Sequence, residues 1–411
     1  MSQTNKLKIF NDPIYGFITI PNSLIYDLIQ HPYFQRLRRI SQMGMSYLVY
    51  PGAHHTRFHH ALGCMHIMQK AVQTLQFKGV SISEEEENAL YIAILLHDIG
   101  HGPYSHAMEH SIVEEVHHEE LSLLFMEQLN KEFDGKLALA IQVFKGEYHR
   151  KFMLQLISSQ LDMDRMDYLK RDSFYSGVAE GNINSERLIQ MMNVQDDYLV
   201  IEEKGIYSVE KFLVARRLMY WQAYLHKTSV VAELILTKIL KRAKELTQKG
   251  TVLPCSEPLQ FFLQHKISLA DFDKSVLDKF SYLDDYDVLG AIKAWQFHDD
   301  FVLQSLCKMI LNRDLLKIQM TDDKPNKENL LAVKNKYISI AKISDKEADY
   351  FVFKGKLKNQ AYSKSSEPIR ILKKDKTIED VVEASDQLHL KALSKPVTKY
   401  FICFPKVVLE S

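Results

Sequence analysis

The stretch AILLHDIGHGPYSH, residues 93–106, decides how the rest of the sequence is interpreted. An apolar run ends on His97 and Asp98, so a buried helix is expected to present an imidazole and a carboxylate at one end. Gly100 and Gly102 let the next backbone segment turn tightly and approach a ligand closely. Such an end suits a metal ion with phosphates beside it. A His-Asp pair alone is a weak signal, because it also occurs at simply capped helix ends.

Composition narrows the class of protein. The chain has 411 residues, which is long for a single core and predicts two or three packed lobes. Its 46% hydrophobic and 25% charged residues are typical of a globular protein. Lys+Arg and Asp+Glu both number 52, so no global basic field indicates a nucleic-acid or membrane partner.

The cellular compartment is predicted from cysteines and apolar runs. The four cysteines are scattered and form no CxxC motif or disulfide framework. The N-terminal MSQTNKLKIFNDP is polar, and no stretch approaches the ~20 apolar residues of a membrane helix. We therefore expect a cytoplasmic protein.

Histidines are concentrated in one part of the chain. Eleven of the 17 lie between His54 and His118. Histidine is the commonest metal ligand and a proton carrier near neutral pH, so this concentration favours a site.

The fold class predicted from periodicity is mainly α. We expect a helical core lobe over residues 1–250, a helical extension over 251–320 and a smaller α+β lobe over 321–411. NDPIYGFITIP near the N-terminus predicts a short strand or a hairpin, and TIEDVVEAS predicts a helix. In the last lobe, candidate strands are predicted at residues 336–343, 350–357, 368–373 and 399–405.

A second chemistry-bearing stretch is LDMDRMDYLKRD, residues 161–172. Helical spacing places Asp164, Tyr168 and Asp172 on one face, with Arg165 at its flank. The acid could ligate a metal, the cation could meet a phosphate, and the phenol and second acid could contact a sugar. The alternative is a solvated helix face with i,i+4 charge pairs.

Taken in order, six motifs resemble the HD-domain deoxynucleoside triphosphate triphosphohydrolases (dNTPases), a family that includes vertebrate enzymes with SAM and HD domains. The resemblance covers roughly residues 6–240, and no SAM domain is expected before the NDP motif. The motifs are NDPIYGFI, FQRLRRISQMG, YPGAHHTRFHHALG, HDIGHGPYSH, HEELS and LDMDRMDYLKRDSFYSG.

The resemblance implies a metal centre of the H…HD…D type. Its ligands would be His60, His97, Asp98 and Asp164. This chain has RFHH where the family usually has RFEH, so His59 replaces a glutamate. Two imidazoles and two carboxylates suit one divalent Fe, Mn, Zn or Ni ion better than Mg²⁺. Mg²⁺ is a further candidate, bound with the substrate triphosphate.

The resemblance also implies the reaction, in which a dNTP is hydrolysed to a deoxynucleoside and tripolyphosphate. His106 and His118 match histidines that could donate or accept the proton. Glu109 and Glu119 match acids that could orient these histidines, and His101 is expected to touch phosphate.

The resemblance also implies which residues contact the substrate. Arg57, Arg165 and Arg216 would meet phosphate oxygens, and Arg165 stands where the family has lysine. The residues expected at the deoxyribose are Gln42, Tyr168, Asp172 and Tyr224, the last packing against the 2′ face. Leu225 replaces a family glutamine near the base, so no base preference is inferred.

The resemblance further implies an activating nucleotide between subunits of a homodimer or homotetramer. Residues matching that site are Lys8, Asn11, Gln35 and Arg38. Gln30 replaces an acid that reads guanine, so we do not expect a guanine-specific activator.

Two rival functions stay open at this point. One is an HD phosphohydrolase acting on another nucleotide or on a nucleoside monophosphate. The other is a catalytically idle regulator that binds nucleotide or nucleic acid. The remaining clustered histidines are expected to be surface, capping or core residues: His54, His55, His66, His110 and His117.

Overall fold

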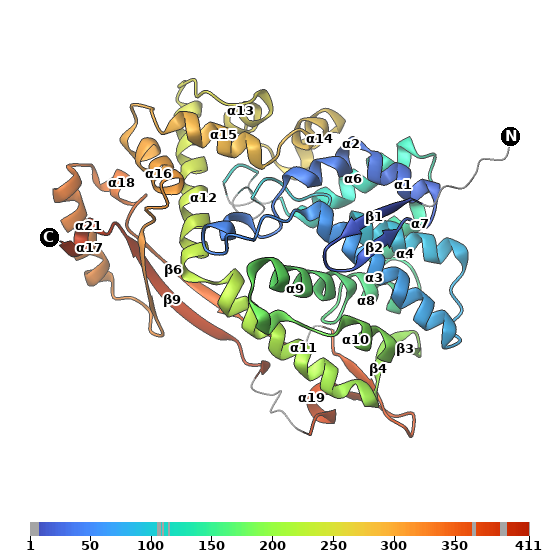
Figure 1. Cartoon of the computed structure of the whole chain (residues 1–411). Coiled ribbons are helices and arrows are strands. Elements are labelled where there is room, and N and C mark those ends of the chain that lie inside the picture. The colour runs from blue at the N-terminus through green and yellow to red at the C-terminus, as the bar shows by residue number, and fades with distance from the viewer. Residues whose placement is uncertain are drawn as a thin grey trace.

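The computed structural model describes residues 8–104, 108, 111–113, 116–363, 367–386 and 393–410. These residues form a mainly α protein with small sheets, which confirms the predicted fold class (Figure 1). Among them, no helix is both long and apolar enough to cross a membrane.

The N-terminal segment is a hairpin, one of the two forms that the sequence predicts. Strands β1 (Ile9–Asp12) and β2 (Gly16–Thr19) pair antiparallel, and the Asp12 carboxylate accepts the backbone N–H groups of Ile14 and Tyr15 in the turn. Helices α1 (Ser23–Gln30) and α2 (Pro32–Gln35) follow.

Three central helices position the site. In α4 (Glu84–Leu96), the Ser83–Glu86 capping box fixes the start, and the last turns are buried. The long α3 (Arg57–Phe77) packs against α4 and against α9 (Met163–Ser176). The other helices of this region are α6 (His118–Glu132), α7 (Ala138–Lys145), α8 (Lys151–Ile157) and α10 (Ser185–Met191).

Long helices connect this centre to the rest of the molecule. Helix α11 (Ile206–Met219) continues through a π-helical turn, Tyr220–Tyr224, and α12 (Lys227–Gln248) follows. Figure 1 shows α12 between the central helices and strands β6 and β9. The helices of the predicted extension are α13 (Glu257–Gln264), α14 (Lys274–Ser281), α15 (Asp285–Trp295) and α16 (Phe301–Leu311).

The C-terminal part combines strands and short helices. Strand β9 (Val397–Phe404) lies between β5 (Lys317–Thr321) and β6 (Phe353–Asn359). Strand β7 (Arg370–Leu372) pairs with β8 (Ile378–Asp380) and also with β4 (Tyr198–Glu202) of the core region, which in turn pairs with β3 (Met192–Gln195). The last segment therefore completes a sheet begun in the core, while the lobe boundaries stay a prediction.

One predicted strand is wrong. Residues 336–343 lie mostly in helix α17 (Lys327–Ala341), which Asn326 caps. Leu330, Val333 and Tyr337 pack into the core at helical spacing, and this outweighs the strand-like alternation of isoleucines. The helix expected at 377–385 is shorter, α19 (Val381–Ala384), and follows β8. The remaining short helices are α18 (Asp345–Ala348) and α21 (Val407–Glu410).

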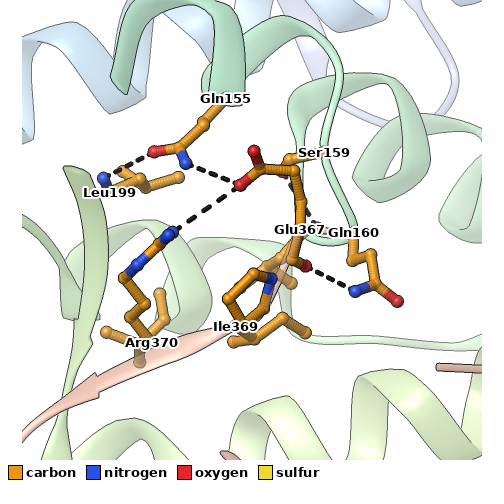
Figure 2. Close-up of a pocket in the computed structure, with 10 residues that line it drawn as sticks. Gln155, Ser159, Gln160, Leu199, Glu367, Ile369 and Arg370 are labelled. Atoms are coloured by element: carbon orange, nitrogen blue, oxygen red, sulfur yellow. Dashed lines mark hydrogen bonds and ion pairs between the residues drawn. The ribbon is translucent and has the colours of Figure 1, made fainter. Parts of the chain in front are cut away.

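Polar contacts attach the segment before β7 to the core (Figure 2). Gln155 of α8 accepts from the backbone N–H of Leu199 and donates to Glu367, both at 2.8 Å. Gln160 donates to the carbonyl oxygens of Ser363 and Glu367. The cavity between these groups, about 20 Å³, holds no more than one water molecule, so this is a packing contact.

Candidate metal centre

Three helices bring the four predicted metal ligands together. His60 lies in the first turn of α3, His97 and Asp98 directly follow α4, and Asp164 lies in the first turn of α9. Nε2 of His60 lies 3.1 Å from Asp164 Oδ1 and 3.7 Å from Asp98 Oδ2. Nε2 of His97 lies 3.5 Å from a carboxylate oxygen of each aspartate. Ligand atoms bound to one transition metal lie about 3.0–3.4 Å apart, so these four groups could hold one ion.

The protonation pattern of His97 fits a ligand. Its Nδ1 donates to the carbonyl oxygen of Ile94 at 2.7 Å, one turn earlier in α4. Its buried Nε2 has no hydrogen-bond partner in the part of the chain that the structure describes. Burial lowers the pKa of His97, but Asp98 and Asp164 raise it above 6.5, so this nitrogen faces the carboxylates either protonated or bound to a cation.

Charge in the centre is compensated by neighbouring groups. Burial lowers the pKa of His60, but contacts with Cys64, Asp164 and Asp167 raise it, and the net direction is well above 6.5. Burial raises the pKa of Asp98, but His97, His101 and Arg57 hold it well below 3.8. Without metal, protons on the imidazoles balance the carboxylates. A bound divalent ion would replace these protons.

Cys64 also lies in this cluster but is a poor ligand candidate. Its Sγ lies 3.5 Å from Nδ1 and 3.6 Å from Nε2 of His60, so it rests against the ring and does not oppose one nitrogen. Burial raises the pKa of the thiol, whereas a metal binds the thiolate. We therefore leave Cys64 out of the ligand set.

Two further histidines border the centre. His101 lies 3.2 Å from Asp98, and its ring stacks on that of His118 with centroids 3.8 Å apart. Burial and Arg57 lower the pKa of His101 to about 3, so its imidazole is neutral. Asp98, His101 and His118 form a second group whose atoms could hold a metal ion, and a ring N–H of either histidine could instead donate to a phosphate.

The turn after the His-Asp pair is fixed by close packing. A Cβ on Gly100 would lie 2.2 Å from the carbonyl oxygen of His118 and 2.3 Å from Ser122 N, so only glycine fits against α6. Tyr104 has a φ of 49°, and its N–H donates to Asp285 of α15 at 3.0 Å. The other carboxylate oxygen of Asp285 accepts from Ser41 N at 2.8 Å.

Farther along α9, Asp172 forms the second end of the site. It accepts hydrogen bonds from His55 at 2.6 Å and from the Tyr224 hydroxyl at 2.7 Å. The His55 ring is buried and stacks on Tyr175. His55 was expected to be a surface, capping or core residue; the structure buries it and also gives it a direct contact with a predicted sugar-binding residue.

Gln42 is linked to His55, at the Asp172 end of the site, by a backbone hydrogen bond. Its N–H donates to the carbonyl oxygen of His55 at 3.0 Å, and Ser41 forms an isolated bridge with Thr56. The side-chain oxygen of Gln42 is buried and has no hydrogen-bond partner among the described residues.

Cations and an aromatic ring lie between the two ends. Tyr168 packs edge-on against Tyr224, with ring centroids 6.0 Å apart. Burial raises the pKa of Tyr168, and nearby Arg165 and Arg216 oppose that rise. Arg165 pairs with Asp162, and Arg57 pairs with Asp98. Two side-chain nitrogens of Arg216 are buried without a partner in the described part of the chain.

Other predicted residues are placed less directly. His106 and Glu109 lie outside the described residues, as does His110. Glu119 is exposed on α6, and its orienting role stays a prediction. His54 and His66 pack against tyrosines, and His117 immediately precedes α6.

The predicted activator residues lie around the hairpin. Lys8 lies over the Tyr26 ring, and Arg38 lies over the ring of Phe58, which also contacts Phe10. Gln35 accepts from Arg38 at 2.8 Å, and Asn11 is exposed on β1. Their activator role stays a prediction.

Two buried residues were missed by the sequence analysis. Asp167 accepts from His60 Nδ1 at 2.8 Å, and Arg171 pairs with Asp167 one turn later. The i,i+4 spacing of this pair was visible in the sequence, but it also fits a solvated ion pair.

The side chains of His and Asp residues from three helical regions thus meet at one point and could hold one metal ion. This arrangement indicates a helical metal-binding protein. Residues 57–172 match the family described as HD domain, and residues 183–252 match HD associated region. The chain is 38% identical to the uncharacterized protein YwfO of Bacillus subtilis over 331 residues, 78% of this chain and 73% of YwfO. It also resembles the crystal structure of a phosphohydrolase from Bacteroides thetaiotaomicron, with a TM-score of 0.94, 49% identity, and 97% and 100% of the two chains covered.

The protein belongs to the HD-domain phosphohydrolase family, and its relatives include dNTPases. Deoxynucleoside triphosphate triphosphohydrolase SAMHD1 of Gallus gallus is 28% identical over 281 residues. That match covers 58% of this chain and 45% of the relative, so the chain spans about half the length of this relative.

Proposed function

We propose that the protein hydrolyses deoxynucleoside triphosphates to deoxynucleosides and tripolyphosphate. The observation that carries the proposal is the arrangement on α9: Asp164 at the candidate metal centre and Asp172, held by His55 and Tyr224, share one helix face. The two aspartates are eight residues apart, about 12 Å along the helix. A nucleotide along this face would place its phosphates near Asp164 and its sugar near Asp172.

The metal ligands in this proposal are His60, His97, Asp98 and Asp164. A divalent Fe, Mn, Zn or Ni ion bound there would supply charge neutralisation and an activated water for attack on the α-phosphorus. Cleavage breaks the bond between the α-phosphorus and the 5′-oxygen, and the deoxynucleoside leaves with a proton on that oxygen.

The basic side chains around the candidate metal centre would bind the phosphates. Arg57, Arg165 and Arg216 would neutralise the triphosphate, and a guanidinium can meet two phosphate oxygens at once. The neutral His101 would donate a hydrogen bond to phosphate. His106 or His118 would supply the proton to the 5′-oxygen, with Glu109 and Glu119 orienting them.

Sugar selection would come from the ordered end of the site. Asp172 would accept from the 3′-hydroxyl, beside Gln42 and Tyr168. Tyr224 would pack against the 2′ face, and its hydrogen bond to Asp172 supports this role because it fixes the tyrosine beside the residue proposed to bind the 3′-hydroxyl. A ribose hydroxyl would then have no space.

The same proposal includes nucleotide-dependent assembly. Lys8, Asn11, Gln35 and Arg38 would bind an activating nucleotide between subunits of a homodimer or homotetramer. Activity that requires a mixture of dNTPs, together with a mass increase on nucleotide addition, is the expected result. Equal rates with single dNTPs and an unchanged mass would contradict this part.

Product analysis with Mn²⁺ tests the activity. Each dNTP, the four ribonucleotides and deoxynucleoside monophosphates are incubated separately and in mixtures, and products are separated by ion-exchange chromatography. We expect deoxynucleoside and tripolyphosphate from dNTPs, lost in His97→Ala. Orthophosphate from monophosphates alone would assign a monophosphatase, and nucleotide binding without turnover would assign a regulator.

A further inference from the structure

We propose that Asp12, Arg171 and Asp167 form a buried positioning chain that sets His60 for metal binding and couples this ligand to the β1–β2 hairpin. The inference rests on the candidate metal centre of the proposed function, but it does not depend on which substrate is used. None of these three residues contacts the site for substrate in the proposed arrangement.

The first link orients the ligand. Oδ2 of Asp167 accepts from His60 Nδ1 at 2.8 Å, and both side chains are completely buried. A carboxylate can only accept here, so Nδ1 of His60 carries a proton. Nε2 faces Asp98 and Asp164, and a metal ion that replaced its proton would meet the Nε2 lone pair there.

The second link holds the carboxylate. Arg171 donates to Asp167 through Nε at 2.8 Å and through a terminal nitrogen at 3.0 Å. This bidentate pair fixes the carboxylate plane, and the guanidinium is buried on all sides. Arg171 extends from the same helix as Asp164, so α9 supplies both a ligand and the support of another ligand.

The third link reaches the hairpin. The other terminal nitrogen of Arg171 donates to Asp12 Oδ2 at 2.7 Å. The second oxygen of Asp12 accepts from Ile14 N at 2.9 Å and from Tyr15 N at 3.0 Å, which closes the turn between β1 and β2. The order of the hairpin and the position of Asp167 are therefore linked through one guanidinium.

Close packing on α3 is a separate observation in favour of the chain. A Cβ on Gly63 would lie 2.0 Å from Asp167 Oδ1 and 2.3 Å from a terminal nitrogen of Arg171. Gly63 is one helical turn after His60, so α3 leaves room for the ion pair directly beside the ligand. No other side chain would fit there without displacing the pair.

The test uses isosteric variants of the full chain. In Asp167→Asn, one of the two accepting oxygens becomes an NH₂ group, which cannot accept a hydrogen bond. Either His60 or Arg171 therefore loses a partner. We expect its Mn²⁺ affinity, measured by chelator competition, to fall about 10–100-fold. Asp12→Asn should lower the affinity by a smaller factor. Asp300→Asn is the matched control, since Asp300 pairs with Arg242 through two contacts and caps α16 far from the centre.

A second readout separates positioning from general stability. Coupling is reciprocal, so Mn²⁺ should slow hydrogen exchange at Ile14 N and Tyr15 N in the unaltered chain and in Asp300→Asn. That protection should vanish in Asp167→Asn. Unchanged Mn²⁺ affinity and unchanged protection in folded Asp167→Asn and Asp12→Asn would overturn the chain alone. Absence of Mn²⁺ binding by the unaltered chain would overturn both the chain and the metal centre.

Discussion

The two ends of the α9 face differ in how their polar groups are satisfied. At the end with Asp164, imidazoles and carboxylates crowd together, and His97 Nε2 has no hydrogen-bond partner among the described residues. At the other end, Asp172 already has two short hydrogen bonds, from His55 and Tyr224. In the proposed function, the first end binds a cation and Asp172 at the second end accepts from a sugar hydroxyl group.

Because the two ends differ in this way, substitutions at each end should affect a different property of the protein. Removing a group from the first end should remove the metal and with it all chemistry. Removing a group from the second end should leave the metal bound and weaken only substrate recognition. Three variants test this separation, and a fourth tests Asp285, which connects the segments beside the two ends.

The largest effect is expected for Asp164→Ala. The variant should lose bound Mn²⁺, and its dNTPase rate should fall by about 10³-fold or more, because a catalytic metal contributes several kcal/mol. Metal content by mass spectrometry and initial rates measure this. Glu186→Gln, on the exposed surface, should behave like the unaltered chain. Full metal occupancy in Asp164→Ala would refute the ligand assignment.

His55→Ala should have the next largest effect on dNTPase activity. Asp172 would lose a buried hydrogen bond from its ring partner, and kcat/KM for dNTPs should fall by about 100-fold. Metal content should stay unchanged. His54→Ala is the matched control, since the neighbouring His54 packs against Tyr47. Loss of metal in His55→Ala would mean that the two ends are not separable.

Asp285 connects the segments beside the two ends, because it accepts from the N–H of Ser41, next to Gln42, and from the N–H of Tyr104, which follows the His97-Asp98 pair. Burial raises its pKa from 3.8 to about 6, so the folded protein holds this proton to higher pH than the unfolded chain does. Between about pH 4 and about pH 6 the free energy of unfolding should therefore decrease as the pH rises, by on the order of 2–3 kcal/mol. Urea denaturation with chelator present should show this decrease, and Asp285→Asn should lack it. If the free energy of unfolding changed equally with pH in both proteins, titration of Asp285 would be ruled out as the cause.

The smallest effect is expected for Tyr224→Phe. It removes one hydroxyl from Asp172 and keeps the ring, so kcat/KM for dNTPs should fall about tenfold while exclusion of ribonucleotides persists. Steady-state kinetics with paired dNTP and rNTP substrates measure both quantities. The exposed Tyr207 gives the control variant Tyr207→Phe. A gain of rNTP turnover in Tyr224→Phe would show that the hydroxyl, not the ring, excludes ribose.

The metal end was the more predictable of the two. His97 and Asp98 are neighbours at the end of an apolar helix, and Asp164 repeats with Tyr168 and Asp172 at helical spacing. Local sequence therefore carries most of the information, and the resemblance to the HD family adds His60. The structure brings these groups together through the packing of α3, α4 and α9.

The sugar end depends on contacts that local patterns do not show. His55 and Asp172 are 117 residues apart, and their contact requires the loop at residues 41–56 to fold over α9. Asp167 and Arg171 look like an ordinary surface pair until their complete burial is known. Likewise, the isoleucine alternation at 336–343 indicates a strand, and only packing of Leu330 and Tyr337 selects the helix.

The central claim is that water attacks the α-phosphorus of a dNTP at the α9 face. The most direct test is hydrolysis of dNTPs in ¹⁸O-labelled water with Mn²⁺, followed by mass spectrometry of the separated products. The account predicts one ¹⁸O atom in tripolyphosphate and none in the deoxynucleoside. Orthophosphate with a deoxynucleoside diphosphate, pyrophosphate with a deoxynucleoside monophosphate, or label in the deoxynucleoside would contradict it.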